Sequence, residues 1–216
     1  DHRDLHSFPT RRSSDLSSLL LLGACNRQPW VAYVEPASGT DTARLRVITN
    51  GEVRGGSYVG CVGNEQGLAK AGRFYDGDKP SINYPQSPLV PPRLGMAPRV
   101  LPKMAEYLGM TRMAEGVYAE IVAEYRVPAG KPFLLVREEL GVGSYGSTYS
   151  KCPALSRVYT FEKGRQYEAY VGMVYGGDVE GKMGVRCPFF VYELQAPNQA
   201  IPQAMESTPA ADRPCR

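Results

Sequence analysis

The sequence predicts an all-β chain folded as an antiparallel β-sandwich. Three observations predict it: apolar and polar residues alternate with period two, the alternating segments are short, and turn-forming residues separate them. The clearest segment is 117–126, in which every second residue is apolar or aromatic and the residues between are mostly polar. A strand with this pattern buries one face against a core and turns the other face to solvent.

Eight strands are expected in chain order, with turns between several of them. They cover residues 30–34, 43–49, 52–60, 117–126, 133–138, 157–162, 166–175 and 185–194. Turn residues are supplied by Asn50-Gly51, Ala129-Gly130 and Lys163-Gly164. Short strands joined in this way pair as antiparallel neighbours and pack as two layers.

Two regions lack the alternation, residues 62–116 and residues 195–216. The first holds seven prolines between positions 80 and 102 and is longer than an ordinary loop; a short helix is expected only at 102–108. The second is rich in Pro, Ala and Gln, and we expect disorder there unless Cys215 is paired. The predicted domain therefore spans 25–194 with the insertion 62–116, and the tail 195–216 follows.

The second half of the insertion, residues 89–113, combines basic and methionine side chains with a single acidic residue, Glu106. A loop of this composition is suited to contact with a protein, because methionine adapts its shape and arginine is enriched at interfaces. We expect partner binding through Arg93, Met96, Arg99, Lys103 and Arg112.

Residues 1–24 read as two segments that precede the folded part. Residues 1–16 have no hydrophobic period, contain both histidines of the chain, and resemble a common sequencing adapter translated in one reading frame. They are treated as an artefact and excluded from the fold. Residues 17–24 resemble the second half of an export signal. This apolar run is too short to cross a bilayer, which needs about 20 helical residues.

The motif Leu22-Gly23-Ala24-Cys25 resembles the lipobox of bacterial lipoproteins, with small residues before an obligatory cysteine. The resemblance implies that Cys25 carries a diacylglyceryl thioether and an N-acyl chain and begins the mature protein. Three acyl chains would give permanent attachment, since two already anchor a protein stably. Asn26 in the next position favours the outer membrane, so we expect a lipoprotein that faces the periplasm and contacts the membrane through Cys25.

Four further cysteines, Cys61, Cys152, Cys187 and Cys215, indicate two disulfides in an exported protein, with three possible connectivities. We prefer Cys152–Cys187, because each precedes a proline at the rim of a neighbouring strand, and this leaves Cys61–Cys215. Loop entropy gives about 4 kcal/mol for the shorter loop and about 5 kcal/mol for the longer one. Free thiols remain the alternative. A zinc site is not expected, since the chain has no C-x-x-C pair and no histidine after His6.

Catalytic motifs are mostly missing from the sequence. Without histidine beyond His6, Ser-His-Asp and Cys-His nucleophiles and histidine-bound metals are excluded. The G-x-G-x-x-G at 141–146 is not followed by a helical pattern, so it reads as a hairpin connection and not as a dinucleotide site. No cofactor and no metal are predicted. The net charge of +3 indicates no nucleic-acid partner.

The order of these features resembles proteobacterial envelope lipoproteins of unknown activity that carry a small sandwich of the immunoglobulin or transthyretin type. The resemblance rests on the lipobox, 43–47, 127–131, 161–167 and the closing Cys-Pro strand. It implies the fold and the envelope location more than an activity. From the anchor, the missing catalytic groups and the basic insertion we expect a membrane-anchored binding or structural module without enzymatic activity, whose partner is an envelope protein or a glycan. Outward tyrosines, Tyr118, Tyr149, Tyr170 and Tyr192, are candidate contacts. The alternative is a glycan-acting enzyme, which requires two carboxylates about 5 to 10 Å apart across a cleft.

Overall fold

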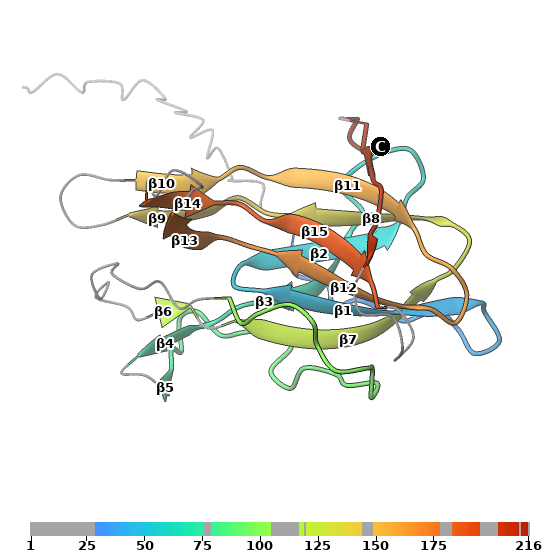
Figure 1. The fold of residues 1–216 in the computed structure, drawn as a ribbon, viewed down its shortest axis with the longest axis horizontal. Helices are drawn as coiled ribbons and strands as arrows, with labels where there is room; N and C mark the ends of the chain where they lie inside the picture. The colour runs from blue at the N-terminus through green and yellow to red at the C-terminus, as the bar shows by residue number, and fades with distance from the viewer. Residues whose placement is uncertain are drawn as a thin grey trace, which may run out of the picture.

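Two five-stranded sheets pack face to face as a β-sandwich, as the sequence predicts (Figure 1). The structure is a computed structural model, and the residues it describes contain strands and no helix. The described residues are 29–75, 79–104, 117–118, 120–143, 149–177, 183–194, 203–211 and 213–215.

The first sheet has the order β16-β15-β12-β1-β7. Its members are β16 (Gln203–Ala204), β15 (Phe189–Glu193), β12 (Gln166–Val171), β1 (Thr42–Thr49) and β7 (Ile121–Pro128). All neighbours are antiparallel except β1 and β12, which run parallel. β1, near the start of the described chain, therefore lies between β7 and β12, two strands that are far from it in sequence.

The second sheet has the order β17-β11-β8-β2-β3 and is antiparallel throughout. Its members are β17 (Thr208–Pro209), β11 (Leu155–Thr160), β8 (Pro132–Arg137), β2 (Glu52–Ser57) and β3 (Gln66–Lys70). The edges of the two sheets therefore correspond: β16 and β17 close one side of the sandwich, and β3 and β7 close the other.

Alternate residues of both sheets meet in one core between the layers. An aromatic group lies at its centre: the Phe161 ring is 4.8 Å from the Tyr167 ring and 5.7 Å from the Phe133 ring, measured between centroids. These three side chains are at most 1% exposed. Aromatic pairs at such distances stabilise a core by about 0.5–1.5 kcal/mol beyond the burial of their area.

Short strands extend the sandwich at one end. They are β9 (Leu140–Gly143) with β10 (Tyr149–Cys152), β13 (Val174–Gly177) with β14 (Met183–Arg186), and β4 (Arg73–Tyr75) between β5 (Lys79–Pro80) and β6 (Val117–Tyr118). Cys152 ends β10 and is bonded to Cys187, which follows β14. The disulfide joins the two hairpins, in agreement with the predicted pairing.

Residues 203–211 and 213–215 form a C-terminal clasp over the open side of the sandwich. The clasp adds β16 to the first sheet and β17 to the second, and Cys215 is bonded to Cys61 across 154 positions. The backbone around this bond is also tied, because the Cys215 N–H donates to Val62 O at 2.9 Å. The second predicted disulfide is therefore present. The described part of the tail is ordered by its pairing with both sheets.

Three expectations need correction. Residues 30–34 form no strand, because only one bridge, between Ala32 and Gly67, joins them to a neighbour. Residues 62–116 are not wholly irregular, since β3 belongs to the second sheet; its glycine and alanine gave no alternating signal. The expected helix at 102–108 is absent from residues 102–104, and its remaining positions lie outside the described residues.

Candidate functional site

Three charged side chains lie side by side on the outer face of the first sheet. Arg46 on β1 is the register partner of Glu124 on β7 and of Glu168 on β12. Arg46 donates to Glu124 Oε1 from Nη2 at 2.9 Å and to Glu168 Oε2 from Nη1 at 2.7 Å. The three side chains are at most 5% exposed. This buried group, the Arg46 cluster, occupies a face that the alternating pattern assigns to solvent.

An extended strap, residues 92–104 of the insertion, covers the Arg46 cluster. Its backbone binds the remaining carboxylate oxygens: Leu94 N–H donates to Glu124 Oε2 at 2.6 Å, and Leu101 N–H donates to Glu168 Oε1 at 2.9 Å. Hydrogen bonds to a charged acceptor are about twice as strong as neutral ones. The strap is therefore fastened to the sheet near each of its ends.

Polar side chains also hold the middle of the strap. Ala97 O accepts a hydrogen bond from Arg46 Nη2 at 2.6 Å, and Ala97 N–H donates to Gln166 Oε1 at 2.9 Å. Arg99 forms an ion pair with Glu120 at 2.5 Å. The strap is thus a fixed part of the fold and not a free loop.

The residues predicted to bind a partner do not gather on one exposed loop. Met96 is 8% exposed, and Arg99 turns back onto the sheet. Arg93 and Lys103 are exposed and make no ion pair with any residue that the structure describes. Arg112 lies outside the described residues. Among the members of the predicted set that the structure describes, Arg93 and Lys103 have a charge that faces outward.

The two carboxylates of the Arg46 cluster are the nearest match to a pair of catalytic acids. Burial by itself raises the pKa of Glu124, but hydrogen bonds from Leu94 N–H and from the Arg46 side chain outweigh it, so the pKa lies below its usual range. Such a group stays ionised and is a poor general acid. Because Arg46 and the strap bind both Glu124 and Glu168, this pair gives no support to the glycan-acting alternative.

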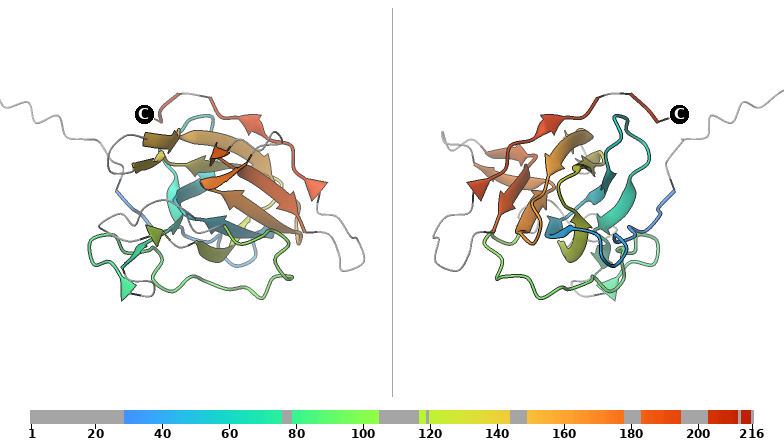
Figure 2. Two further views of the ribbon diagram at one scale, coloured as in Figure 1. Left: turned by 60° about the vertical axis from the view of Figure 1, so that its left-hand side comes forward. Right: turned by 90° about the vertical axis from the view of Figure 1, so that its right-hand side faces the viewer.

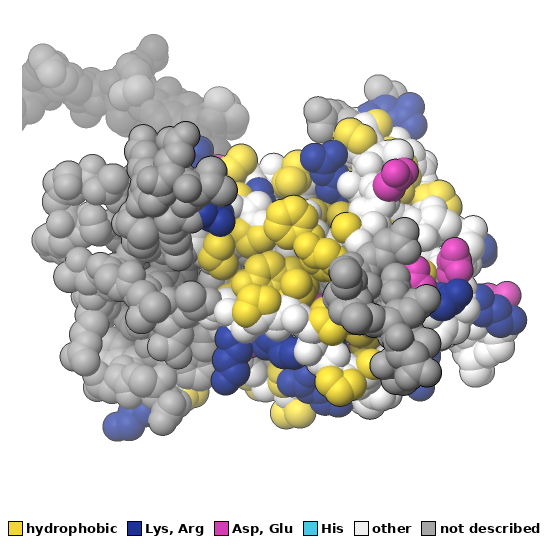
Figure 3. All heavy atoms as spheres, viewed as in Figure 1, with side chains coloured by type: hydrophobic (Ala, Val, Ile, Leu, Met, Phe, Trp, Pro, Cys, Tyr) yellow, Lys and Arg dark blue, Asp and Glu magenta, His cyan; other side chains and the backbone are white. Residues whose placement is uncertain are grey.

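Beside the strap, three aromatic side chains lie on the outer face of β12 and β15, here called the aromatic face: Phe190 is exposed, and Tyr170 and Tyr192 are half-buried. Tyr170 is the register partner of Phe190, and the Phe190 and Tyr192 rings lie 6.4 Å apart between centroids. Phe190 is 52% exposed, and Val100 of the strap is 49% exposed. Figure 3 shows apolar side chains gathered over these strands, with Lys and Arg side chains below them. Water-facing sheet surfaces are ordinarily polar, so this surface is a candidate for binding.

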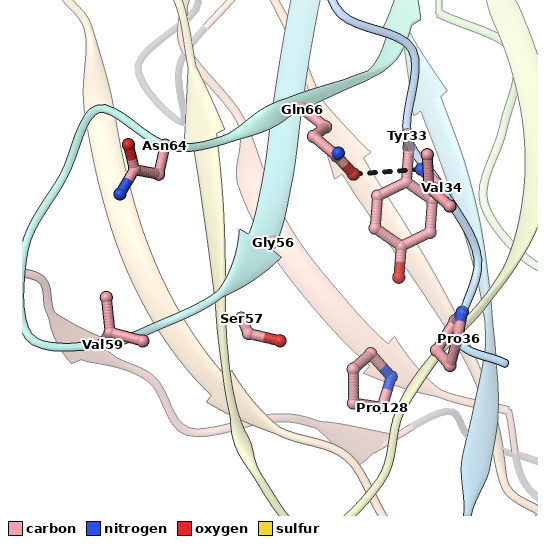
Figure 4. Close-up of a pocket in the computed structure, with 9 residues that line it drawn as sticks. All are labelled: Tyr33, Val34, Pro36, Gly56, Ser57, Val59, Asn64, Gln66 and Pro128. Atoms are coloured by element: carbon pink, nitrogen blue, oxygen red, sulfur yellow. Dashed lines mark hydrogen bonds between the residues drawn. The ribbon is translucent and has the colours of Figure 1, made fainter. Parts of the chain in front are cut away.

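A second candidate is a shallow hollow of about 420 Å³ at the side of the sandwich closed by β3 and β7 (Figure 4). Val34 and Val59, which are 70% and 69% exposed, stand on its rim. Ser57 and Asn64 supply polar side chains, whereas Gln66 accepts a hydrogen bond from Val34 N–H at 3.0 Å. The complete lining is Tyr33, Val34, Pro36, Gly56, Ser57, Val59, Asn64, Gln66 and Pro128.

Tyr33 separates the hollow from the core. Its ring meets the Tyr125 ring edge-on at 5.6 Å, and its hydroxyl donates to Arg126 O at 3.2 Å. Burial, with a smaller contribution from Glu35, raises the pKa of Tyr33 far above its ordinary value. The phenol therefore stays protonated, and its role is to close the hollow toward the core and not to transfer protons.

The sequence did not reveal the Arg46 cluster as a buried group. Alternation placed Glu124 correctly on the outer face of its strand, but a charged outer face is ordinarily solvated. The one available signal was the long insertion, whose backbone needs acceptors for its N–H groups when it lies on a protein surface. No rule of spacing shows which strand such a segment will cover.

Comparison of the chain with protein-family models, with curated proteins and with solved structures gives no match. The described part of the chain has no helix with the length and hydropathy of a membrane span. No three His, Cys, Asp or Glu side chains within it are grouped to hold a metal ion. Cys25, the predicted lipidation site, lies outside the described residues.

Proposed function

We propose that this chain is a lipid-anchored binding module of the bacterial envelope, attached to the outer membrane through Cys25 and without enzymatic activity. The observation that carries the binding role is the aromatic face, formed by Tyr170, Phe190 and Tyr192 beside the strap. Phe190 is exposed at its centre, whereas most of the other aromatic side chains that the structure describes lie in or against the core.

Two features support the anchored location. The sequence before Cys25 has the small residues that a lipoprotein signal peptidase requires. The disulfides Cys61–Cys215 and Cys152–Cys187 are of a kind that persists in oxidising compartments such as the periplasm. Both features agree with export followed by acylation.

The chemistry of the aromatic face favours a protein partner over a glycan. Sugar recognition usually adds charged or amide side chains to aromatic rings, and those beside the face are already engaged: Glu168 and Gln166 bind the strap, and Glu120 binds Arg99. Of the side chains described there, only the phenols of Tyr170 and Tyr192 are left to bind hydroxyl groups. The face offers rings and Val100, the combination typical of the centre of a protein interface. The partner is therefore expected to be another envelope protein.

The anchor is tested by the intact mass of the protein, made in a bacterium behind a complete lipoprotein signal and measured without reductant. We expect a chain that begins at Cys25, carries added acyl mass and lacks four hydrogens for two disulfides. A chain that retains residues 17–24 without lipid would contradict the anchoring.

The partner is tested by placing a photo-crosslinking amino acid at position 190 in the lipidated protein within living cells. Position 82 is the matched control, because Ile82 is 95% exposed and lies away from β12 and β15. We expect a protease-sensitive adduct from position 190 only, and Phe190→Asp should abolish the complex while Ile82→Asp preserves it. An adduct digested by a glycan hydrolase would identify a glycan instead, and equal adducts at both positions would refute the binding role.

A further inference from the structure

The chain leaves the folded domain at a fixed point. Pro29 O accepts a hydrogen bond from Arg54 Nη1 at 3.2 Å, and the Arg54 guanidinium lies 5.7 Å from the centroid of the Trp30 ring. The Trp30 ring packs directly on Gly67, where a Cβ atom would overlap it. Arg54 is 4% exposed, so this contact is part of the domain and not a surface association.

The following residues are bound along the edge of β3. Gly67 N–H donates to Val31 O at 2.6 Å, Tyr33 N–H donates to Gly67 O at 2.9 Å, and Val34 is held by Gln66. Residues 29–36 therefore add a fixed segment to this side of the sandwich. Together with β3, this segment is called here the anchor side.

Only four steps of chain separate Pro29 from Cys25. Fully extended, they reach at most about 14 Å. A domain of this length has a radius of gyration of about 16 Å and is thus about 40 Å across. If Cys25 sits in the membrane interface, the tether is too short for the domain to turn its far side toward the lipid.

The anchor side also has exposed apolar side chains, which a surface in contact with lipid requires. Val31, Val34 and Val59 are 51%, 70% and 69% exposed, and the last two share the rim of the hollow (Figure 4). Isolated exposed apolar residues are common, but three on the side where the tether leaves suit an interface with acyl chains and headgroups. The guanidinium of Arg213, at the end of the C-terminal clasp, donates to Gly60 O at 3.2 Å, one position after Val59 in the chain.

We propose that the anchor side lies against the lipid surface, with Trp30 at the interface, and that the aromatic face is held on the opposite side, away from the membrane. The proposal rests on acylation of Cys25. Figure 2 shows residues 29–36, drawn in blue, and β15 on opposite sides of the sandwich, as the strand orders require. An anchored molecule would then present its binding surface to the periplasm without a flexible linker.

Trp30 is the only tryptophan in the chain, so its fluorescence reports the position of the anchor side directly. The lipidated protein, verified by mass, is reconstituted into vesicles of phosphatidylethanolamine and phosphatidylglycerol that contain increasing fractions of a lipid brominated near the headgroup. We expect Trp30 emission to fall as the brominated fraction rises, because bromine quenches indole only at close range.

Two variants make the test specific. Trp30→Phe combined with Phe190→Trp moves the reporter to the aromatic face, and its emission should not change with the brominated fraction. A flexible Gly/Ser segment of 20 residues inserted between Gln28 and Pro29 has a root-mean-square span of about 25 Å and should relieve the quenching of Trp30. The insertion changes no residue of the folded domain.

The outcomes separate the two proposals. Lipidated protein whose Trp30 is not quenched, or is quenched no more than a reporter at position 190, would overturn the orientation and leave the anchoring intact. Quenching that persists unchanged with the inserted linker would also overturn it, since the short tether would not be its cause. A chain that carries no lipid would overturn the anchoring and the orientation with it.

Discussion

Replacing Arg46 by methionine is expected to destabilise the fold strongly. The substitution keeps most of the side-chain volume and removes the charge that faces two carboxylates, each at most 4% exposed. Removing one partner of a buried ion pair is destabilising by about 3–5 kcal/mol, because the remaining charge is left without compensation. For a domain of this size, each kcal/mol shifts the melting temperature by about 2–4 °C, so a decrease of roughly 10 °C is expected.

Urea unfolding and calorimetry on the folded domain measure this effect. The matched control is Arg165→Met, since Arg165 is 55% exposed and its ion pairs with Glu162 and Glu193 are 3.7 and 3.5 Å long. Exposed pairs contribute about 0–1 kcal/mol, so the control should unfold almost as the parent protein does. Equal effects of the two substitutions would refute the argument from burial.

A triple apolar variant, Arg46→Met with Glu124→Leu and Glu168→Leu, tests what the strap contributes. Apolar replacement of a whole buried ion cluster is often neutral or stabilising. Here it also removes the acceptors of the Leu94 and Leu101 N–H groups, and each unsatisfied group is destabilising by about 1–3 kcal/mol. The triple variant should therefore remain less stable than the parent. Parent-like stability would show that the strap does not depend on these carboxylates.

Three further predictions follow from the contacts. The pKa of Glu124 is lower in the folded state than in the unfolded state, so the carboxylate contributes fully to the free energy of unfolding above roughly pH 4.3. This contribution is lost as the pH falls through the lower pKa of the folded state. In a plot of the urea midpoint against pH, Glu124→Gln should therefore show a smaller decrease at acid pH than the parent protein. The double variant Cys61→Ser and Cys215→Ser should have a free energy of unfolding lower by up to about 5 kcal/mol, and the amides of its C-terminal clasp should exchange hydrogen faster. Gly67→Ala should displace the indole ring packed on it, shift its emission to the red and lose about 1–3 kcal/mol, whereas Gly184→Ala, with open space at its Cβ, should do neither.

The sheet architecture was predictable because it depends on a local property. Alternation identified segments that became β1, β7, β8 and β12, and the inward residues of these strands form the core. The parallel pairing of β1 with β12 was not predictable, since the alternating pattern is the same for either direction of a neighbour. Pairing is decided by contacts between segments more than 100 positions apart, which single-sequence patterns do not record.

The candidate surfaces were predictable only in part, for the same reason. Alternation placed Tyr170 and Tyr192 on the outer face of their strands, and the structure brings them together with Phe190. The basic and methionine-bearing loop was expected to contact a partner, but its Leu94 and Leu101 N–H groups donate to Glu124 and Glu168 of the domain itself. The composition of a segment shows which side chains it has, but it does not show which surface of the fold the segment will pack against.

The C-terminal clasp determines how this domain can be recognised. Its short strands occupy the open edges of both sheets on one side, and on the other side residues 31–33 bond to β3 while Pro92 O and Glu35 accept the Glu124 and Arg126 N–H groups of β7. A partner that joins proteins by adding a strand finds these positions taken. Under the proposed binding role, a partner would contact side chains across a sheet face. Its specificity would depend on a few exposed rings, which can be substituted without disturbing the backbone pairing beneath them.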